Sequence, residues 1–343
     1  MKLSALVGMR RSPERLAATA RGMEAVGVEY LWTGEAYTAD AVSTMGFLAA
    51  VTERARIGSS ILPIYTRTPT VLAMTAVGVD RLSSGRCILG LGASGPQVIE
   101  GFHGVPYDAP LQRTREIIDI CRMVWRRERL VHDGPKYFVP LPEGQGTGLG
   151  KALKIIDEPV RDRIPIYVAS MGPKNVEMTA EVADGWLPLH FLPEKAADVW
   201  GEALAAGRAR RPADSGPLEI VAGGSLAIGD DLEDLRQRDR AALALYFGGM
   251  GARDKNFYNE LLRRYGYEAE AERIQDEYLS GRRKEAAAAV PQEFIDGTSL
   301  VGPEGWVRER VAAYREAGVT VLHVQAVGEN RLADLEKVRS WLE

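Results

Sequence analysis

The sequence predicts an α/β fold in the form of a single (β/α)8 TIM barrel with insertions. Three observations lead to this fold class: eight short apolar runs with strand character, helix-like segments between successive runs, and a chain of 343 residues, which one large barrel can occupy. Alternation at this spacing implies right-handed crossovers and a parallel sheet. The alternative is a doubly wound, two-domain enzyme, which the number of strands disfavours.

The first half of the chain supplies four rounds of strand and helix. Ser12 and Pro13 give the first helix an N-cap and a proline at its first position, and Gly27 ends it. Pro69 opens the third helix, and Gly85 turns the chain into the fourth strand. The strands are expected at residues 3–7, 30–33, 56–62 and from 87 onward, and the helices at 13–26, 39–52, 69–82 and 110–127.

The alternation breaks twice in the second half. Residues 128–162 are rich in Gly and Pro and predict a long loop with room for a small hairpin. Residues 253–289 are charged and helix-prone, so they predict a helical insertion. We therefore expect one barrel domain over residues 1–343, with insertions near 128–162 and 252–297. The remaining strands are expected at 165–169, 185–189, 218–228 and 319–324, and the remaining helices at 173–182, 194–210, 232–246, 303–317 and 331–342.

Composition argues against several classes of protein. The chain has 43 basic and 47 acidic residues, a net charge of −4, which offers no broad basic surface for nucleic acid. Cys87 and Cys121 are too few for a disulfide framework, which indicates a reducing cytoplasm. We expect neither a membrane span nor a signal peptide, because no stretch approaches 18 apolar residues and Arg10 and Arg11 directly follow the apolar N-terminus.

A glycine-rich loop follows the fourth strand. Residues 86–100 read RCILGLGASGPQVIE, which matches the G-x-G-x-x-G pattern of nucleotide-binding loops. A dinucleotide-binding domain is disfavoured, because the helical pattern after Gly95 lasts barely two turns and no strand ending in an acid follows about 20 residues on. We therefore place the loop at the C-terminal end of a barrel strand, where such folds build their sites.

A second loop resembles the first. Ser170, Met171 and Gly172-Pro173 follow the fifth strand, so both loops place Gly-Pro at the start of a helix. Helix N-termini have free N–H groups and a partial positive charge, which suits a phosphate group. Either Gly-Pro alone is explained equally well as a helix start. Together, on one barrel rim, the two loops favour a phosphate-bearing cofactor.

Acidic, basic and histidine side chains are candidates for chemistry. Glu35 follows the second strand, so it is expected at the barrel mouth as a proton carrier or substrate holder; the alternative is a carboxylate that stabilises the start of the next helix. Arg67 follows the third strand and either binds an anion or lies solvated in its loop. His190 follows the sixth strand and is either a pocket residue or a structural one. The four histidines, His103, His132, His190 and His323, lack partners at metal-ligand spacing, so no metal is expected.

The order of several blocks resembles the luciferase-like monooxygenase superfamily of flavin- and deazaflavin-dependent barrel enzymes. The resemblance covers nearly the full length and is greatest to actinobacterial oxidoreductases that use coenzyme F420, a group that includes methylenetetrahydromethanopterin reductases. It implies a cytoplasmic, homodimeric enzyme that transfers a hydride between F420 and a small organic substrate. The blocks that carry it are LWTGEAYTADA, ARIGSSILPIYTRTPTVLAMTA, DRLSSGRCILGLGASGPQVIEGFHG, IPIYVASMGPKNVEMTAEVADGW and GPEGWVRERVAAYREAGVT.

The resemblance also implies roles for individual residues. Ser60-Ile61 corresponds to a bulge that supports the deazaflavin ring, often through a non-prolyl cis peptide, and Glu35 would sit near the reactive carbon as the catalytic residue. The ribityl and phosphate region of the cofactor is assigned to Gly92, Ala93, Ser94 and Gly95 on one side and to Ser170, Met171, Gly172 and Pro173 on the other. Ser94 is the polar side chain of its loop expected to touch the cofactor.

The chain departs from two branches of the superfamily. Sugar-phosphate dehydrogenases have Asp-His where this chain has Glu35-Ala36 and an acid where it has Gly95, and reductases carry a glutamate in the region of Leu6. The substrate is therefore left open, with its walls expected from residues 134–154 and 253–289. The alternatives to an F420 oxidoreductase are an FMN-dependent monooxygenase and a non-catalytic flavin- or deazaflavin-binding protein.

Overall fold

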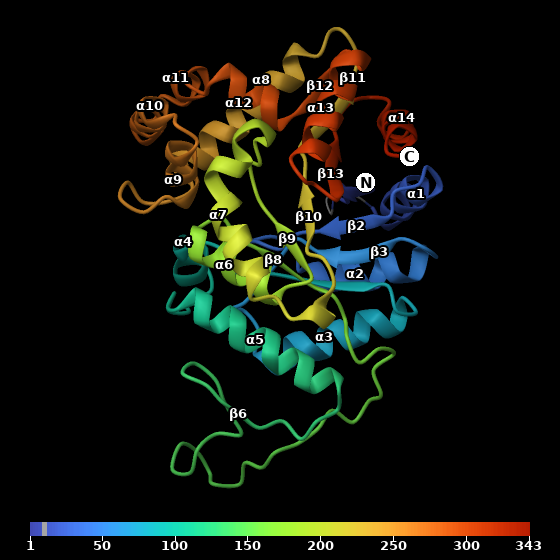
Figure 1. The fold of residues 1–343 in the computed structure, drawn as a ribbon, viewed down its shortest axis with the longest axis vertical. Coiled ribbons are helices and arrows are strands. Elements are labelled where there is room, and N and C mark those ends of the chain that lie inside the picture. Colours follow the sequence, from blue (N-terminus) through green and yellow to red (C-terminus); the bar gives the residue numbers. More distant parts are fainter. Residues whose placement is uncertain (9–11) are drawn as a thin grey trace.

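A computed structural model describes residues 1–8 and 12–343 and shows a closed barrel of eight parallel strands with helices around it (Figure 1). The barrel closes because the first strand pairs with the last, with Lys2 opposite Val321. The predicted fold class is therefore confirmed. The barrel strands are β1 (Lys2–Leu6), β2 (Tyr30–Thr33), β3 (Arg56–Ser59), β5 (Cys87–Gly92), β8 (Ile166–Ala169), β9 (Gly185–Leu187), β10 (Glu219–Ala222) and β13 (Val321–Ala326).

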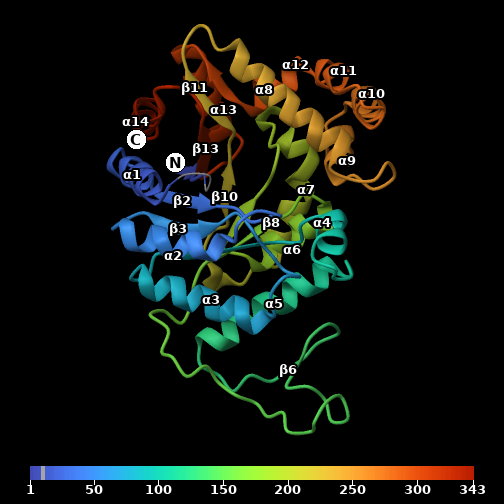
Figure 2. The same ribbon diagram turned by 180° about the vertical axis from the view of Figure 1, so that it is seen from behind.

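Helices follow the strands and cover the outside of the barrel, as the two opposite views show (Figures 1 and 2). Their starts follow the sequence signals: Ser12 accepts a hydrogen bond from the Arg15 N–H, and Thr68 accepts one from the Val71 N–H. The outer helices are α1 (Pro13–Ala25), α2 (Ala41–Val51), α3 (Pro69–Leu82), α5 (Pro110–Trp125), α6 (Pro173–Val182), α7 (Ala196–Ala209), α13 (Glu304–Glu316) and α14 (Arg331–Trp341). Short 3-10 turns lie at Pro193–Lys195 and Ala213–Ser215.

Two predicted strands are interrupted. The third ends at Ser59, and after the Ser60–Ile61 peptide the short strand β4 (Leu62–Pro63) pairs with β5. The seventh divides at Gly223-Gly224 into β10 and β11 (Ser225–Ile228), and only glycine fits at Gly223, because a Cβ there would lie 2.0 Å from the carbonyl oxygen of His323. β11 pairs with β12 (Leu300–Gly302), a strand that the sequence analysis missed. The barrel wall therefore extends beyond the eight-strand core on one side.

The first excursion, residues 128–162, extends as an irregular arm from one end of the body (Figure 1). It contains the small antiparallel pair β6 (His132–Asp133) and β7 (Phe138–Val139). Glu116 on α5 holds the base of the arm: it is buried and accepts hydrogen bonds from the backbone N–H of Tyr137 and of Lys136. The loop with a small hairpin predicted here is present.

The second excursion is helical, as its composition predicts. After α8 (Glu233–Ala244) the chain makes a π-helical turn at Leu245–Gly249. The segment continues through α9 (Phe257–Arg264), α10 (Glu268–Leu279), α11 (Arg283–Ala288) and α12 (Gln292–Thr298). Figure 1 shows these helices gathered at the end of the molecule opposite the arm.

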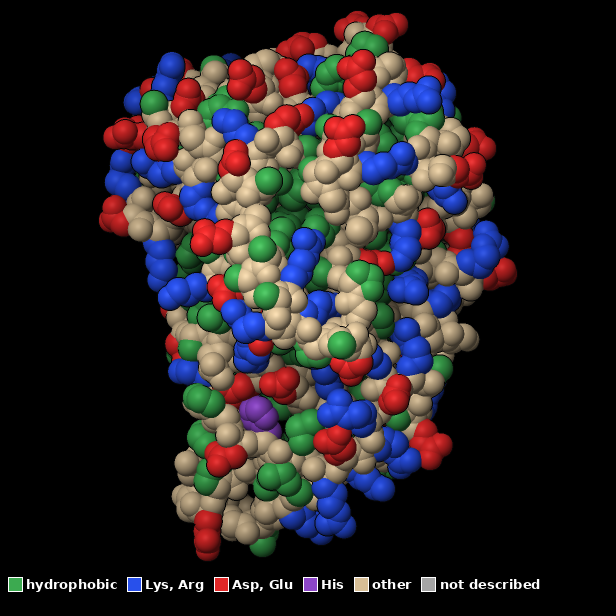
Figure 3. Space-filling view, viewed as in Figure 1, with side chains coloured by type: hydrophobic (Ala, Val, Ile, Leu, Met, Phe, Trp, Pro, Cys, Tyr) green, Lys and Arg blue, Asp and Glu red, His purple; other side chains and the backbone are tan. Residues whose placement is uncertain are grey.

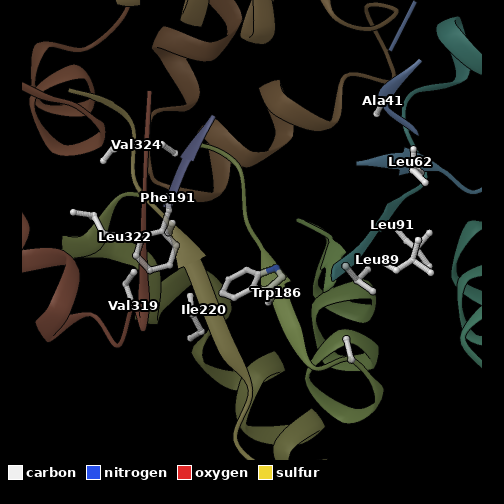
Figure 4. Packing of buried hydrophobic residues seen from close by; sticks show 14 of the residues in the cluster. Ala41, Leu62, Leu89, Leu91, Trp186, Phe191, Ile220, Val319, Leu322 and Val324 are labelled. Carbon is white, nitrogen blue, oxygen red and sulfur yellow. The ribbon is translucent and has the colours of Figure 1, made fainter. Parts of the chain in front are cut away.

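The core has two parts. Most buried apolar side chains pack between the barrel and its helices, including Trp186 and Phe191 (Figure 4). A smaller cluster fills the barrel interior. At the N-terminal end of the barrel, Glu219 accepts hydrogen bonds from Lys2, Tyr30 and Tyr167. This polar group closes that end of the barrel, which leaves the opposite mouth for a site.

Candidate active site

The two glycine loops emerge side by side at the mouth. Gly92 at the end of β5 is in register with Ala169 at the end of β8. Gly95 precedes the short helix α4 (Pro96–Gly101), and Gly172 precedes α6. Neither helix has a side-chain cap, and a Cβ at Gly95 or Gly172 would meet no atom within 4 Å. Two uncapped helix starts therefore face open space, and α6, with ten residues, has the longer helix dipole.

The loops offer a ligand mainly backbone N–H groups. The Ser170 side chain is buried, and its hydroxyl forms a hydrogen bond of 2.9 Å with the Thr179 hydroxyl. The Met171 carbonyl accepts from the indole N–H of Trp200. Ser94 has a left-handed backbone, with φ of 58°, and its carbonyl accepts from the Tyr107 hydroxyl at 3.3 Å. The Ser94 hydroxyl is thus the side-chain group of these loops with no hydrogen-bond partner among the described residues.

The Ser60–Ile61 peptide is cis, as the resemblance predicts. The bulge packs tightly against glycines of the neighbouring strands: a Cβ at Gly92 would lie 2.8 Å from Ile61 Cγ1, and a Cβ at Gly34 would lie 2.9 Å from the Ser60 carbonyl oxygen. Ile61 itself contacts the interior cluster of the barrel. The glycines therefore let the bulge approach its neighbours at the mouth. Contact of the bulge with a cofactor stays a prediction.

Glu35 and Arg67, which sequence analysis treated separately, form one bidentate ion pair. Arg67 Nη1 lies 2.6 Å from Glu35 Oε1, and Nη2 lies 2.9 Å from Oε2. The hydrogen bonding of the Arg67 guanidinium to the Glu35 carboxylate, which accepts, raises the pKa of Arg67. The carboxylate also accepts the backbone N–H of Ala41 at the start of α2. This is the helix-start arrangement considered as the alternative, and the catalytic role of Glu35 stays a prediction.

An aromatic wall meets the mouth from the second excursion. His190 has a left-handed backbone, with φ of 55°, and its ring centroid lies 4.8 Å from that of Tyr246 and 5.9 Å from that of Tyr258. Burial lowers the pKa of His190 to about 3, and its Nε2 is buried without a hydrogen-bond partner. Tyr246 lies in the π-helical turn, a feature common near functional sites. Sequence analysis missed Tyr246, Tyr258 and Tyr107 because no short spacing links them to the strand ends.

The described residues contain neither a cluster suited to a metal ion nor a helix suited to cross a membrane. No group of three or more His, Cys, Asp or Glu side chains is arranged to hold a metal ion in that part of the chain. None of the helices within residues 1–8 and 12–343 combines the length and apolar character needed to cross a membrane. Acidic and basic side chains are interspersed over the face seen in Figure 3.

The fold and the mouth define a (β/α)8 barrel protein with two glycine loops at the C-terminal ends of adjacent strands, and the chain belongs to the luciferase-like monooxygenase family, whose model matches residues 2–321. A Mycobacterium tuberculosis protein named as a coenzyme F420-dependent oxidoreductase is 41% identical over 98% of both chains. A 5,10-methylenetetrahydromethanopterin reductase of Archaeoglobus fulgidus is 27% identical over 86% of this chain and 84% of its own. The coenzyme F420-dependent tetrahydromethanopterin reductase of Methanopyrus kandleri has the same fold, with a TM-score of 0.79 and 21% identity over 98% of this chain and 97% of that one.

Proposed function

We propose that this protein is an F420-dependent oxidoreductase that transfers a hydride between the deazaflavin and a small organic substrate. The observation that supports this function most is the pair of adjacent, uncapped helix starts at Gly95 and Gly172 beside the Ser60–Ile61 bulge. The family and the named relative of 41% identity agree with this reading.

The residues at the mouth fit a ligand with a phosphate and a flat ring. We assign the phosphate to the backbone N–H groups after Gly172 and Gly95, where a Cβ would meet nothing, and the ring to the bulge at Ser60–Ile61. When bound, the deazaflavin supplies the hydride chemistry. The protein holds the ring at the mouth and keeps an apolar surface beneath it.

The phosphate assignment is tested with Gly172→Asp. An aspartate at this N-cap caps α6 and places a negative charge where the phosphate would lie, so the affinity for F420 should fall at least tenfold while folding stability is kept. The matched control is Gly305→Asp, which puts the same charge in the first turn of α13, where a Cβ also meets no atom within 4 Å. F420 titration followed by fluorescence gives both affinities. Equal affinities for the two variants would contradict the assignment.

An FMN-dependent monooxygenase is the second candidate function, because the same N–H groups suit the FMN phosphate. Parallel titrations with FMN and F420 separate the two. Tight binding of FMN without binding of F420 would favour the monooxygenase. Binding of F420 with no turnover of any substrate would favour a non-catalytic binding protein.

We also propose a homodimer in the cytoplasm, with substrate walls from residues 134–154 and 253–289. The contact of Tyr258 with His190 supports the second wall. Light scattering of the purified chain measures the oligomeric state directly.

A further inference from the structure

His323 lies inside the barrel where the packed interior gives way to the mouth. Side chains alternate along a strand, so Val321, His323 and Gln325 of β13 share the inward face. Val321 is fully buried, His323 is partly exposed, and Gln325 is exposed. The burial gradient therefore places the imidazole at the floor of the mouth.

Apolar side chains contribute to this floor. They belong to the interior cluster of the barrel or pack against it, and they come from the C-terminal ends of β1, β8 and β9 and from the bulge after β3. Apolar pockets with a few placed polar groups are typical of small-molecule sites. The apolar members are Leu6, Ile61, Ala169 and Leu187.

Ser4 fixes the orientation of the imidazole. The Ser4 side chain is fully buried on β1, and its Oγ lies 3.1 Å from His323 Nδ1 and 3.3 Å from the Leu322 carbonyl oxygen. A carbonyl can only accept, so the Ser4 hydroxyl donates to Leu322 and accepts from Nδ1–H. The lone pair of the ring is then on Nε2, for which the described residues provide no hydrogen-bond partner. The Trp32 ring packs perpendicular to the imidazole at 6.4 Å, and burial lowers the pKa of His323 to about 4, so the ring is neutral at pH 7.

We infer that His323 Nε2 is the catalytic base that accepts the proton of a substrate hydroxyl, an inference that rests on the oxidoreductase function proposed above. The substrate class is an alcohol and its carbonyl product. The alcohol loses its carbon-bound hydrogen, with the electron pair of that bond, to oxidised F420, and it loses its hydroxyl proton to Nε2. The electron pair of the O–H bond becomes the carbonyl π bond, and the imidazolium returns its proton to water. Ser4 is a positioning residue.

The first experiment uses diethyl pyrocarbonate, which acylates unprotonated, accessible imidazole nitrogens, with mass spectrometry to locate the product. His103 and His190 are internal controls because their Nε2 atoms are buried, and His132 Nε2 contacts Glu116. His323 should react, and saturating F420 should slow its reaction at least fivefold. An unreactive His323, or one that F420 does not protect although it binds, would overturn the inference. Failure of F420 to bind would instead overturn the proposed function.

The second experiment separates catalysis from structure. In ¹⁵N spectra of histidine-labelled protein, Nδ1 should carry the proton, and Ser4→Ala should lose this preference while its F420 affinity stays within twofold. A wild-type ring protonated on Nε2, or a preference unchanged in Ser4→Ala, would refute the positioning role. With F420 and 2-propanol, cyclohexanol or 1-phenylethanol, His323→Gln should lower turnover at least about a hundredfold without weakening F420 binding. Normal turnover by His323→Gln, or no oxidation of these alcohols by wild-type protein, would overturn the assignment.

Discussion

The Glu35–Arg67 pair should contribute more to folding stability than any exposed ion pair of this chain. The side chains of Glu35 and Arg67 are 8% and 17% exposed, and two hydrogen bonds join them. Removing one partner of a buried pair costs about 3–5 kcal/mol, because the remaining charge is left uncompensated. The loss in unfolding free energy caused by Arg67→Met should lie near the lower end of this range, about 3 kcal/mol. The Glu35 carboxylate still accepts the Ala41 N–H and still lies at the positive end of the α2 dipole.

A double-mutant cycle measures the interaction itself. Glu35→Gln should cost about 1–3 kcal/mol, because Arg67 can turn toward water and the amide can still accept from Ala41. The double variant should be less destabilised than the sum of the single variants by about 1–3 kcal/mol. Urea unfolding followed by circular dichroism gives each free energy of unfolding.

The control is Asp157→Asn, which removes the ion pair of Asp157 with Arg81. These side chains are 62% and 50% exposed, so the cost should stay below about 1 kcal/mol. If the losses in unfolding free energy of Glu35→Gln and Arg67→Met simply add up in the double variant, the claim that this pair stabilises the fold would be refuted. If Glu35→Gln kept full stability but lost turnover with F420, the carboxylate would be catalytic and not a structural anchor of the mouth.

Two more predictions concern backbone fit and acid sensitivity. Gly78→Ala should raise the free energy of unfolding by about 0.5–1 kcal/mol, because Gly78 lies on the exposed face of α3 and a Cβ there meets nothing within 4 Å. Gly90→Ala should lower the free energy of unfolding by more than about 3 kcal/mol, because the Cβ at this position would lie 1.7 Å from the Ser59 carbonyl oxygen. Thermal unfolding ranks the two variants, and equal melting temperatures would contradict the packing. Burial acts to raise the pKa of Glu24, but hydrogen bonds from the backbone N–H groups of residues 53–55 outweigh it and hold the pKa below its ordinary value. The ionised Glu24 carboxylate therefore contributes its full stabilisation of the fold above the ordinary glutamate pKa, and this contribution is lost as the pH falls through the lowered pKa of Glu24 in the folded protein. The difference in unfolding free energy between wild type and Glu24→Gln should be largest near pH 7 and should shrink in acid. A difference independent of pH would contradict this assignment.

Local signals were enough to predict most elements. The strand expected at residues 30–33 matches β2 (Tyr30–Thr33), and the predicted N-cap Ser12 accepts the hydrogen bond of the Arg15 N–H. The seventh strand was predicted without its break at Gly223-Gly224. A Cβ at Gly223 would lie 2.0 Å from the carbonyl oxygen of His323, which is about a hundred residues away in sequence. Close approaches of this kind leave no local pattern.

The site was predictable to the extent that strand order defines neighbours. Glu35 and Arg67 follow adjacent strands, so their pairing could have been predicted once both were placed at the mouth. The neighbours of His190 could not be predicted in this way, because Tyr246 comes from the π-helical turn and Tyr258 from the second excursion. Nothing in a single sequence shows where such a segment returns to the barrel.

Strand order also relates the two halves of the proposed site. Around the closed barrel the order is β1, β2, β3, β5, β8, β9, β10 and β13, so β5 and β8 lie opposite the β13 and β1 pair. The two glycine loops follow β5 and β8, whereas His323 and Ser4 lie on β13 and β1. In the proposed binding mode, a ligand held by its phosphate at one rim, with its ring over the bulge after β3, would extend toward His323 across the mouth. The affinity change in Gly172→Asp and the protection of His323 therefore examine opposite ends of one ligand, and agreement between them would support a single binding mode better than either result alone.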